Sequence, residues 1–395
     1  MRVCIVHSWH HRRGGDSVAA WDLADRLEAA GHEVARFAMR HPDNDPSPWS
    51  VRWPVWVEPG QPADARHRVR SWASLAWNED AGRAARTLYR DVRPDIVHAH
   101  HIHRHLTPAV LHAARALGIP IVQTAHDYEW ICPEGHLFSQ GAPCTACRGH
   151  RYGEAVLRRC KRGALAPSVA VAAEKWLHQA MGARNWVDQY LSPSRFLAEK
   201  LASFGIPRER IAVLPNPVAV SPPTPPGKGW VFAGRLTREK GSAVLAAAMK
   251  DLPGTVVGDG PEALALQSGM PGTRFTGHLS AAGVNAQLGA AAVVVVPSIW
   301  WENQPYAVTE AQALGRAVVA SDLGGIPELI DHGRDGLLVP AGDPRALREA
   351  VGALLADPGR CQALGDAART RVARDLDPAR HLTATLEVYQ RIRNR

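Results

Sequence analysis

Residues 293–339 read VVVVPSIWWENQPYAVTEAQALGRAVVASDLGGIPELIDHGRDGLLV. The run Val293–Val296 is apolar and β-branched, which predicts a strand buried on both faces. A turn then leads to a helix pattern that begins near Tyr306 and continues to Leu314, where Gly315 ends it. A buried strand followed by a helix is the repeating unit of a parallel α/β sheet.

The same unit repeats in the second half of this stretch. Ala317–Ala320 predicts another buried strand, and Gly324–Gly325 predicts the start of a helix around Pro327–Ile330. Two consecutive units of this kind predict the α/β fold class with a parallel sheet.

Two acidic residues occupy positions at which such a sheet binds ligands. Glu302 lies in the turn after the first strand, and Glu310 lies in the following helix. Loops at the carboxyl ends of parallel strands line the ligand crevice, and helix N-termini present free N–H groups to anions. Backbone amides near Asn303, Gln304 and Tyr306 are therefore candidates for binding phosphate, while the two carboxylates can accept hydrogen bonds from hydroxyls. A nucleotide sugar combines both kinds of group; two solvated acids are the simpler alternative.

These motifs resemble family 4 of the retaining nucleotide-sugar glycosyltransferases. The resemblance rests on Pro297-Ser298-x-x-x-Glu302, on the Glu302–Glu310 pair with seven residues between, on GGIPE at 324–328 and on GLLV at 336–339. It implies the GT-B architecture, in which two Rossmann-like domains face a central cleft and a C-terminal helix crosses back to the N-terminal domain. It also implies transfer of a sugar from a nucleoside-diphosphate sugar, with metal-independent donor binding and no cofactor required for catalysis.

Length and composition are those of an ordinary globular protein. The length of 395 residues suggests two or three domains. The chain is 46% apolar and 21% charged, and its sequence contains no apolar run of about 18 residues. The start, MRVCIVHSW, is too short an apolar run for a signal peptide, so we expect a cytoplasmic protein without a transmembrane segment. The net charge of +8 predicts an anionic partner. Charge alone does not choose among a nucleotide, lipid headgroups with peripheral membrane contact, and nucleic acid.

We place an N-terminal, acceptor-side domain at residues 1–215. A strand over Arg2–Ser8 precedes Gly14–Gly15, and Asp16 or Ser17 is expected to cap the next helix. The glycine pair lets backbone approach a ligand closely, although the dinucleotide fingerprint GxGxxG is absent. The resemblance implies that the Gly14–Gly15 loop faces the donor phosphate and the acceptor.

Histidines follow the next two strands of this domain. Five of them lie within residues 98–105, at the end of a strand over Pro94–His98, but no carboxylate joins them in the sequence. A metal site and a cleft-lining role both remain open for this cluster. His126, beside Asp127, ends the strand Pro120–Thr124 and suits hydrogen bonding to a sugar hydroxyl. The resemblance implies contact of His126 with the donor sugar; a satisfied structural histidine is the alternative.

Four of the six cysteines fall within residues 132–160, which we treat as a Cys-rich insertion. The central two have C-x₂-C spacing, and the residues between the cysteines are glycine-rich and polar. A structural zinc site is the preferred interpretation, with free thiols and a disulfide or redox role as alternatives. The candidate ligands are Cys132, Cys144, Cys147 and Cys160.

Five tryptophans lie within residues 49–77, a segment that is also rich in proline. An acceptor platform, a membrane-surface patch and a local core beneath a long loop are all compatible with this pattern.

The C-terminal domain is predicted at residues 230–377, after a Pro- and Gly-rich linker at 216–229 and before a returning helix at 378–395. Arg235 and Lys240 follow its first strand and precede a helix, an arrangement suited to clamping a diphosphate and stabilising a leaving group. The resemblance assigns that role to both. Further donor-side candidates lie in loops at strand ends that would hold the base largely through backbone groups: Gly234, Gly258, Asp259, Gly260, His278 and Leu279.

The sequence thus predicts a retaining glycosyltransferase whose catalytic candidates are His126, Glu302, Arg235 and Lys240. In this hypothesis Glu310 binds the ribose and Glu302 the sugar hydroxyls. The acceptor stays unidentified, with a lipid, a saccharide or a small natural product as candidates. A sugar-nucleotide epimerase or hydrolase on the same fold is one alternative. A zinc-bearing nucleic-acid-binding protein is a weaker one, because the basic residues are scattered.

Overall fold

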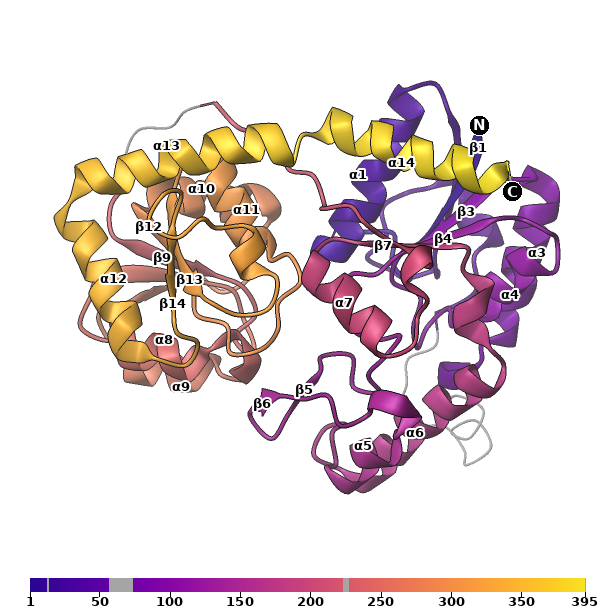
Figure 1. The fold of residues 1–395 in the computed structure, drawn as a ribbon, viewed down its shortest axis with the longest axis horizontal. Helices are drawn as coiled ribbons and strands as arrows, with labels where there is room; N and C mark the ends of the chain where they lie inside the picture. The colour runs from indigo at the N-terminus through magenta and orange to yellow at the C-terminus, as the bar shows by residue number, and fades with distance from the viewer. Residues whose placement is uncertain (13, 57–73, 223–226, 395) are drawn as a thin grey trace.

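The computed structural model describes residues 1–12, 14–56, 74–222 and 227–394. Figure 1 shows two α/β units side by side, each built on a parallel sheet, with a long helical segment running from the second unit onto the first. Among these residues, no helix is both long and apolar enough to cross a membrane.

The first unit is a six-stranded sheet of order β2-β1-β3-β4-β7-β8, and all its neighbouring strands are parallel. The order reverses between β1 and β3, which opens a ligand crevice at the carboxyl ends of these strands. Its strands are β1 Arg2–Val6, β2 Glu33–Phe37, β3 Ile96–Ala99, β4 Ile121–Thr124, β7 Gln189–Ser192 and β8 Ile211–Val213. Its main helices are α1 Gly15–Ala29, α3 Glu79–Val92, α4 Ala109–Arg115, α6 Leu165–Ala180 and α7 Arg195–Ser203.

The second unit is also a six-stranded parallel sheet, of order β11-β10-β9-β12-β13-β14. Here the order reverses between β9 and β12. The strands are β9 Trp230–Ala233, β10 Gly254–Val257, β11 Arg274–Phe275, β12 Val293–Val296, β13 Ala317–Ser321 and β14 Leu337–Val339. The helices are α8 Ser242–Met249, α9 Ala263–Gly269, α10 Ala281–Ala290, α11 Tyr306–Ala313 and α12 Pro344–Ala356.

Strand β12 is buried on both faces, as the sequence predicts. Val293 and Val295 belong to one hydrophobic cluster of the second unit, whereas Val294 and Val296 belong to another. Successive side chains of a strand point to opposite faces, so this alternation places β12 between two helical layers.

Two C-terminal helices connect the units. α13 (Pro358–Asp375) packs on α11 and β13 of the second unit, and α14 (Pro378–Arg393) follows after a break at Asp377. The hydroxyl of Tyr389 on α14 lies 2.5 Å from Nδ1 of His98, and Val388 and Ile392 join the core of the first unit. The α/β fold class with two facing units and a returning helix is therefore confirmed (Figure 1).

An insertion between β4 and α6 contains little regular structure. Its elements are the antiparallel strands β5 (Phe138–Ser139) and β6 (Ala142–Pro143) and the short helix α5 (Gly153–Leu157). None of these was predicted, and neither were α9 and α10, because such short or Gly- and Ala-rich segments give weak periodicity.

Two local expectations were wrong. The helix expected around Pro327–Ile330 is a single 3₁₀ turn over Ile326–Glu328. The Leu329 carbonyl accepts a hydrogen bond from the Gln312 side chain at 2.8 Å, in place of a backbone amide of a further helical turn. At α1 the N-cap is Gly14, not Asp16 or Ser17. The Ser17 hydroxyl instead donates to the Gly14 carbonyl at 2.9 Å.

The described tryptophans of the 49–77 segment pack inward. Trp53 is buried and donates from its indole N–H to the Arg36 carbonyl at 2.8 Å, and the Trp56 ring packs edge-on against His41 at 4.5 Å. These contacts favour a local core for this part of the segment. Trp72 lies outside the described residues.

Candidate active site

The predicted site residues gather at the two points where the strand orders reverse. Loops after β1 and β3, together with His126 in the loop after the neighbouring β4, carry the histidines of the first unit, and loops after β9 and β12 carry Lys240 and Glu302 of the second. The two groups meet where α1 and α11 begin. A Cβ atom at Gly15 would lie 2.5 Å from the Tyr306 ring, so only glycine allows this close approach.

Lys240 and Glu302 form the centre of the second group. The Lys240 ammonium lies 2.7 Å from Oε1 of Glu302, and the Ser298 hydroxyl donates to the same oxygen at 2.6 Å. Burial by itself raises the pKa of Glu302, whose exposed fraction is 4%, but the charge and hydrogen bonds of Lys240 and Ser298 bring the pKa below its ordinary value. Glu302 is therefore an ionised carboxylate in a buried position.

Gly241 makes this ion pair possible. Its φ of 78° lies in the left-handed region, and a Cβ atom there would lie 1.9 Å from the Pro297 carbonyl oxygen. The loop after β9 is thus pressed directly against the loop after β12, which brings Lys240 to Glu302.

Arg235 does not join this pair. Its side chain is 61% exposed and lies 3.7 Å from Glu239, which leaves the guanidinium at the surface of the same loop. The neighbouring loops after β9 and β10 are closely joined, since the Leu236 amide donates to the Asp259 carbonyl at 2.9 Å. A Cβ atom at Gly258 would lie 1.9 Å from the Gly234 carbonyl oxygen. Three further predicted residues border these loops: Gly260 follows Asp259, and His278 and Leu279 follow β11.

Helix α11 supplies amides and a second carboxylate. No side chain caps its N-terminus at Tyr306, so its first N–H groups are available to an anion. Glu310 lies one turn later, and burial raises its pKa to about 7. At neutral pH this carboxyl group is therefore divided between its protonated and ionised forms.

The side chains of Asn303 and Gln304 bind the first unit and the linker. Asn303 donates to the His126 carbonyl at 2.8 Å. Gln304 makes two hydrogen bonds with the backbone of Asn216, of 2.7 and 2.8 Å. Both polar atoms of the Gln304 side chain are thus engaged, whereas Oδ1 of Asn303 has no hydrogen-bond partner among the described residues. This interdomain role was missed because sequence spacing does not show which loops meet.

His126 ends a column of stacked imidazoles in the first unit. Ring centroids lie 4.4 Å apart for His98 and His100, and 5.2 Å apart for His100 and His126. Nε2 of His126 lies 2.9 Å from Nδ1 of His100. Burial lowers the pKa of His126 to about 4, so the ring is neutral at neutral pH.

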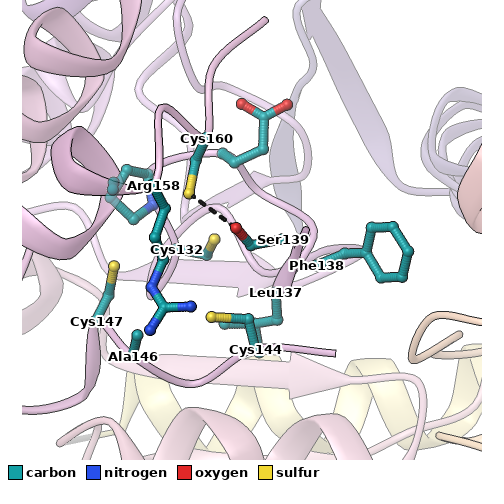
Figure 2. Close-up of a pocket in the computed structure, with 12 residues that line it drawn as sticks. Cys132, Leu137, Phe138, Ser139, Cys144, Ala146, Cys147, Arg158 and Cys160 are labelled. Carbon is teal, nitrogen blue, oxygen red and sulfur yellow. Dashed lines mark hydrogen bonds between the residues drawn. The ribbon is translucent and has the colours of Figure 1, made fainter. Parts of the chain in front are cut away.

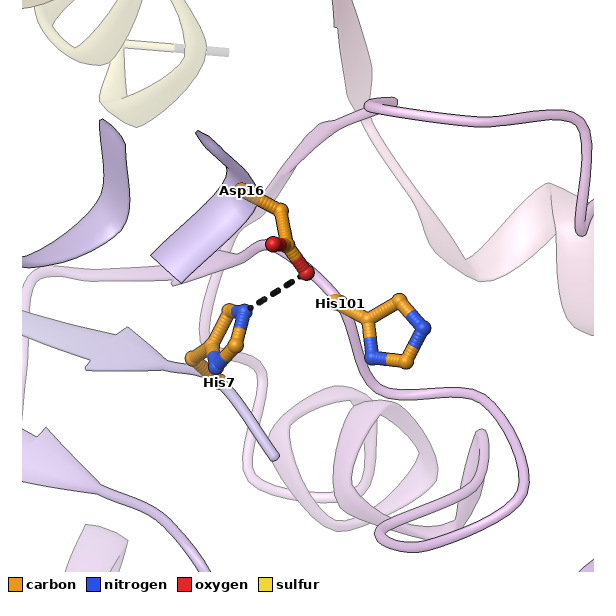
Figure 3. A group of neighbouring side chains, drawn as sticks. All are labelled: His7, Asp16 and His101. Atoms are coloured by element: carbon orange, nitrogen blue, oxygen red, sulfur yellow. Dashed lines mark hydrogen bonds and ion pairs between the residues drawn. The ribbon is translucent and has the colours of Figure 1, made fainter. Parts of the chain in front are cut away.

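A histidine–carboxylate group lies next to this column (Figure 3). Nε2 of His7 is 3.2 Å from Oδ2 of Asp16, and the ligand atoms of His7, Asp16 and His101 all lie within 4.8 Å of one another. Burial acts to raise the pKa of Asp16, but hydrogen bonding and charge from His7 lower it overall. The fold thus brings to the histidines a carboxylate that is remote from them in the sequence.

His101 also takes part in a second such group, with Asp127 and Glu129. Burial and the neighbouring Glu129 raise the pKa of Asp127. Histidine and carboxylate ligands of this kind suit a divalent cation as well as a hydroxyl group.

The four predicted zinc ligands lie together in the insertion, away from Lys240 and Glu302, and line one cavity (Figure 2). Sequence reasoning missed another contact between the units. The Glu328 carboxylate accepts from the Arg195 and Phe196 amides at 2.8 and 2.7 Å, at the start of α7.

Two doubly wound α/β units and a returning C-terminal helix define the GT-B architecture. Comparison with known proteins agrees. The family "Glycosyltransferase Family 4" matches residues 13–221, and "Glycosyl transferases group 1" matches residues 227–357. The chain belongs to glycosyltransferase family 4.

Its similarity to individual relatives extends over most of its length. It is 33% identical to a GDP-mannose-dependent alpha-mannosyltransferase of Mycobacterium tuberculosis, over 87% of this chain and 85% of the relative. It is 28% identical to a glycogen synthase of the same species, over 98% of this chain and 94% of the relative. The fold is also similar to sucrose-phosphate synthase from Thermosynechococcus elongatus, with a TM-score of 0.71, 19% identity and coverage of 99% and 98%. The structure of Anabaena HepE in complex with UDP and glucose is similar with a TM-score of 0.69 and 17% sequence identity, over 99% of each chain.

Proposed function

We propose that this glycosyltransferase transfers a sugar from a nucleoside-diphosphate sugar to an acceptor with retention of anomeric configuration. One observation carries the proposal: the buried Lys240–Glu302 pair of the second unit and the histidine–carboxylate group of the first lie on loops that converge where Gly15 meets Tyr306. The side with Lys240 and the first amides of α11 suits the diphosphate, and the side with imidazoles and carboxylates suits hydroxyl groups.

The donor lies against the second unit in this proposal. Arg235, Lys240 and the first amides of α11 hold the diphosphate, and Glu310 accepts hydrogen bonds from the ribose. Glu302 is oriented by Lys240 and Ser298 to accept from sugar hydroxyls. The base lies near the loops of Gly258 and His278. Its identity stays open, because the named relatives and neighbours differ: one is GDP-mannose-dependent and another is bound to UDP.

Leaving-group stabilisation is assigned to Lys240. A preorganised cation beside the bond that breaks lowers the barrier because negative charge develops on the phosphate oxygen. The Glu302 oxygen that Lys240 contacts also accepts from Ser298, which makes it a poor nucleophile. We therefore propose same-face substitution. The bond from the anomeric carbon to the phosphate oxygen breaks, the bond to the acceptor oxygen forms on that face, and the acceptor proton passes to the departing phosphate oxygen.

His126 positions the sugar in this scheme. Its Nε2 is engaged with His100, which leaves Nδ1 for a sugar hydroxyl. Because its pKa is lowered to about 4, the imidazole acts as a neutral hydrogen-bonding group between about pH 5 and 8.

The test is calorimetric binding of UDP, GDP, ADP and TDP to the full chain, with and without EDTA. We expect one nucleotide to bind with micromolar affinity, to keep that affinity in EDTA, and to lose it in Glu310→Ala. Binding that EDTA abolishes and that added Mg²⁺ or Mn²⁺, but not Zn²⁺, restores would contradict metal-independent donor binding. If none of the four binds, the donor-site assignment fails.

Product analysis by mass spectrometry then separates the chemistries. We expect turnover of the matching nucleotide sugar to depend on an added acceptor. Turnover that gives free sugar or an epimerised nucleotide sugar without acceptor would favour hydrolase or epimerase chemistry.

A further inference from the structure

The insertion between β4 and α6 contains four cysteines that gather around one cavity. Cys132 follows β4, Cys144 and Cys147 follow β6, and Cys160 follows α5. All four line a cavity of about 20 Å³, which the side chain of Arg158 also lines (Figure 2). None of them forms a disulfide.

The chain after Cys132 wraps around its sulfur atom. Backbone N–H groups of four successive residues face the sulfur: Glu134, Gly135, His136 and Leu137. Gly135 adopts a φ of 91° in this loop, which favours glycine. N–H groups that converge on a sulfur stabilise it as a thiolate, the form that binds metals.

The insertion is also too sparse in regular structure to be held by its own backbone. β5 and β6 have two residues each, and α5 has five. Segments this short contribute few hydrogen bonds, although Leu137, Tyr152 and Ala155 pack into the core of the first unit. Small loop-rich segments are commonly fixed further by disulfides or by a metal.

We propose that Cys132, Cys144, Cys147 and Cys160 bind one structural zinc ion. Four sulfur ligands, two of them at C-x₂-C spacing, are a typical tetrahedral zinc set. All four side chains line the same cavity, as one ion requires. Binding converts four thiols into four thiolates on Zn²⁺ and releases four protons.

The cysteine side chains must move to complete this site. Among the residues that the structure describes, the groups whose ligand atoms lie within 4.8 Å of one another are the two histidine–carboxylate groups, so the sulfurs are spaced more widely. A tetrahedral ion with Zn–S bonds of about 2.3 Å requires sulfurs about 3.8 Å apart. Rotation about χ1 of cysteines that line the same cavity closes this gap.

The zinc would support the active site without taking part in the chemistry. The insertion and the residues just before it touch the loop of Glu302 at two points: His136 packs edge-on against Trp300 at 5.3 Å, and the Tyr128 hydroxyl donates to the Trp301 carbonyl at 2.9 Å. Gly141 lies against Arg238, near Lys240. An ordered insertion therefore holds the loops that carry the catalytic ion pair.

Native mass spectrometry of the full chain, with elemental analysis of the same sample, tests the proposal. We expect one zinc per chain, with a deconvoluted mass that exceeds that of the acid-denatured protein by one zinc atom less two hydrogens, because Zn²⁺ replaces two protons at equal ion charge. Cobalt substitution should give the intense near-ultraviolet band of thiolate-to-metal charge transfer. Metal content should fall at least tenfold in Cys144→Ser and Cys147→Ser and stay unchanged in Cys361→Ser, a buried cysteine of α13 outside the insertion.

Each other outcome overturns the proposal. A metal-free wild-type chain with all thiols reactive indicates free cysteines, and a mass lower by two hydrogens indicates a disulfide. Iron with acid-labile sulfide indicates a cluster. Because the wild-type measurement alone distinguishes these cases, poor folding of a cysteine variant does not prevent a decision.

Discussion

The two points of strand-order reversal occupy equivalent places in their sheets but present opposite chemistry. In the first unit the crevice is lined by imidazoles and carboxylates, and burial lowers the pKa of both His100 and His126. In the second unit it is lined by glycine-rich loops, a lysine and the uncapped start of α11. The same topology therefore supports imidazoles and carboxylates, which suit hydroxyl groups, on one side, and a lysine and helix amides, which suit phosphates, on the other.

The contrast teaches that local backbone chemistry, not the sheet, decides the ligand. Glycines at 241 and 258 let neighbouring loops approach within van der Waals contact. At the other crevice, bulky rings stack on one another and leave ring nitrogens as the polar groups. Four substitutions test this difference, in order of decreasing effect.

Lys240→Ala should have the largest effect. It removes the cation beside the leaving group and leaves Glu302 buried without its ion-pair partner. We expect kcat to fall by about 10²–10³. Steady-state kinetics with the matching donor measures this. Lys250→Ala, at an exposed lysine after α8, is the matched control. Turnover within twofold of wild type in Lys240→Ala would refute the assigned role.

Glu310→Gln should weaken nucleotide binding by about 10- to 100-fold, because it removes hydrogen bonds to a charged group, and the loss of such bonds usually has an effect of this size. The raised pKa of about 7 has a further consequence. Ribose hydroxyls favour the ionised carboxylate, so binding at pH 7 should release up to about half a proton, and affinity should rise with pH through 7.

Calorimetry in two buffers of different ionisation enthalpy detects that proton. Glu310→Gln should abolish the buffer dependence, and a wild-type enthalpy that is equal in both buffers would contradict the assignment. The sign for stability is opposite to that for binding. Because the folded pKa lies above the ordinary value of 4.5, the group's contribution to the free energy of unfolding is complete below about pH 4.5 and decreases as pH rises through 7.

Gly15→Ala tests the meeting of the two crevices. Its Cβ would overlap the Tyr306 ring, so we expect the loops to separate and kcat/KM to fall about tenfold, because misplaced reactive groups lose rate steeply. In the double variant Gly15→Ala/Tyr306→Ser, the loss of kcat/KM, expressed as a free energy, should be smaller than the sum of the losses in the two single variants. Gly272→Ala, where nothing lies within 4 Å, is the control. Full additivity would indicate that the two residues do not contact each other.

Much of the fold could be predicted because its signals are local. The buried run Val293–Val296 is strand β12 in the structure. Helix α11 ends just before Gly315, where the sequence predicted its end. Lys240 and Glu302 were also predicted as parts of one site, because both follow strands whose carboxyl ends share an edge.

Other parts of the site depend on contacts between distant segments. Asp16 looked like a helix cap, but the fold places it against His7 and His101. The backbone of Gln304 was predicted to contact the donor, and the contact of its side chain with the Asn216 backbone was not predicted. Neither contact leaves a periodic pattern or a fixed spacing in the sequence. Each joins segments that are brought together only when the loops pack in the folded protein.

Glu328→Ala should have the smallest effect, because this carboxylate joins the units without facing either crevice. It accepts from the Arg195 and Phe196 amides at the positive end of α7, and Arg371 holds its backbone carbonyl at 2.7 Å. Loss of such a cap costs about 1 kcal/mol in the free energy of unfolding. Urea denaturation should show that loss, with nucleotide affinity unchanged. Glu349→Ala, on the exposed face of α12, is the control. A tenfold loss of nucleotide affinity in Glu328→Ala alone would mean that this contact between the units, and not only the two crevices, determines donor binding.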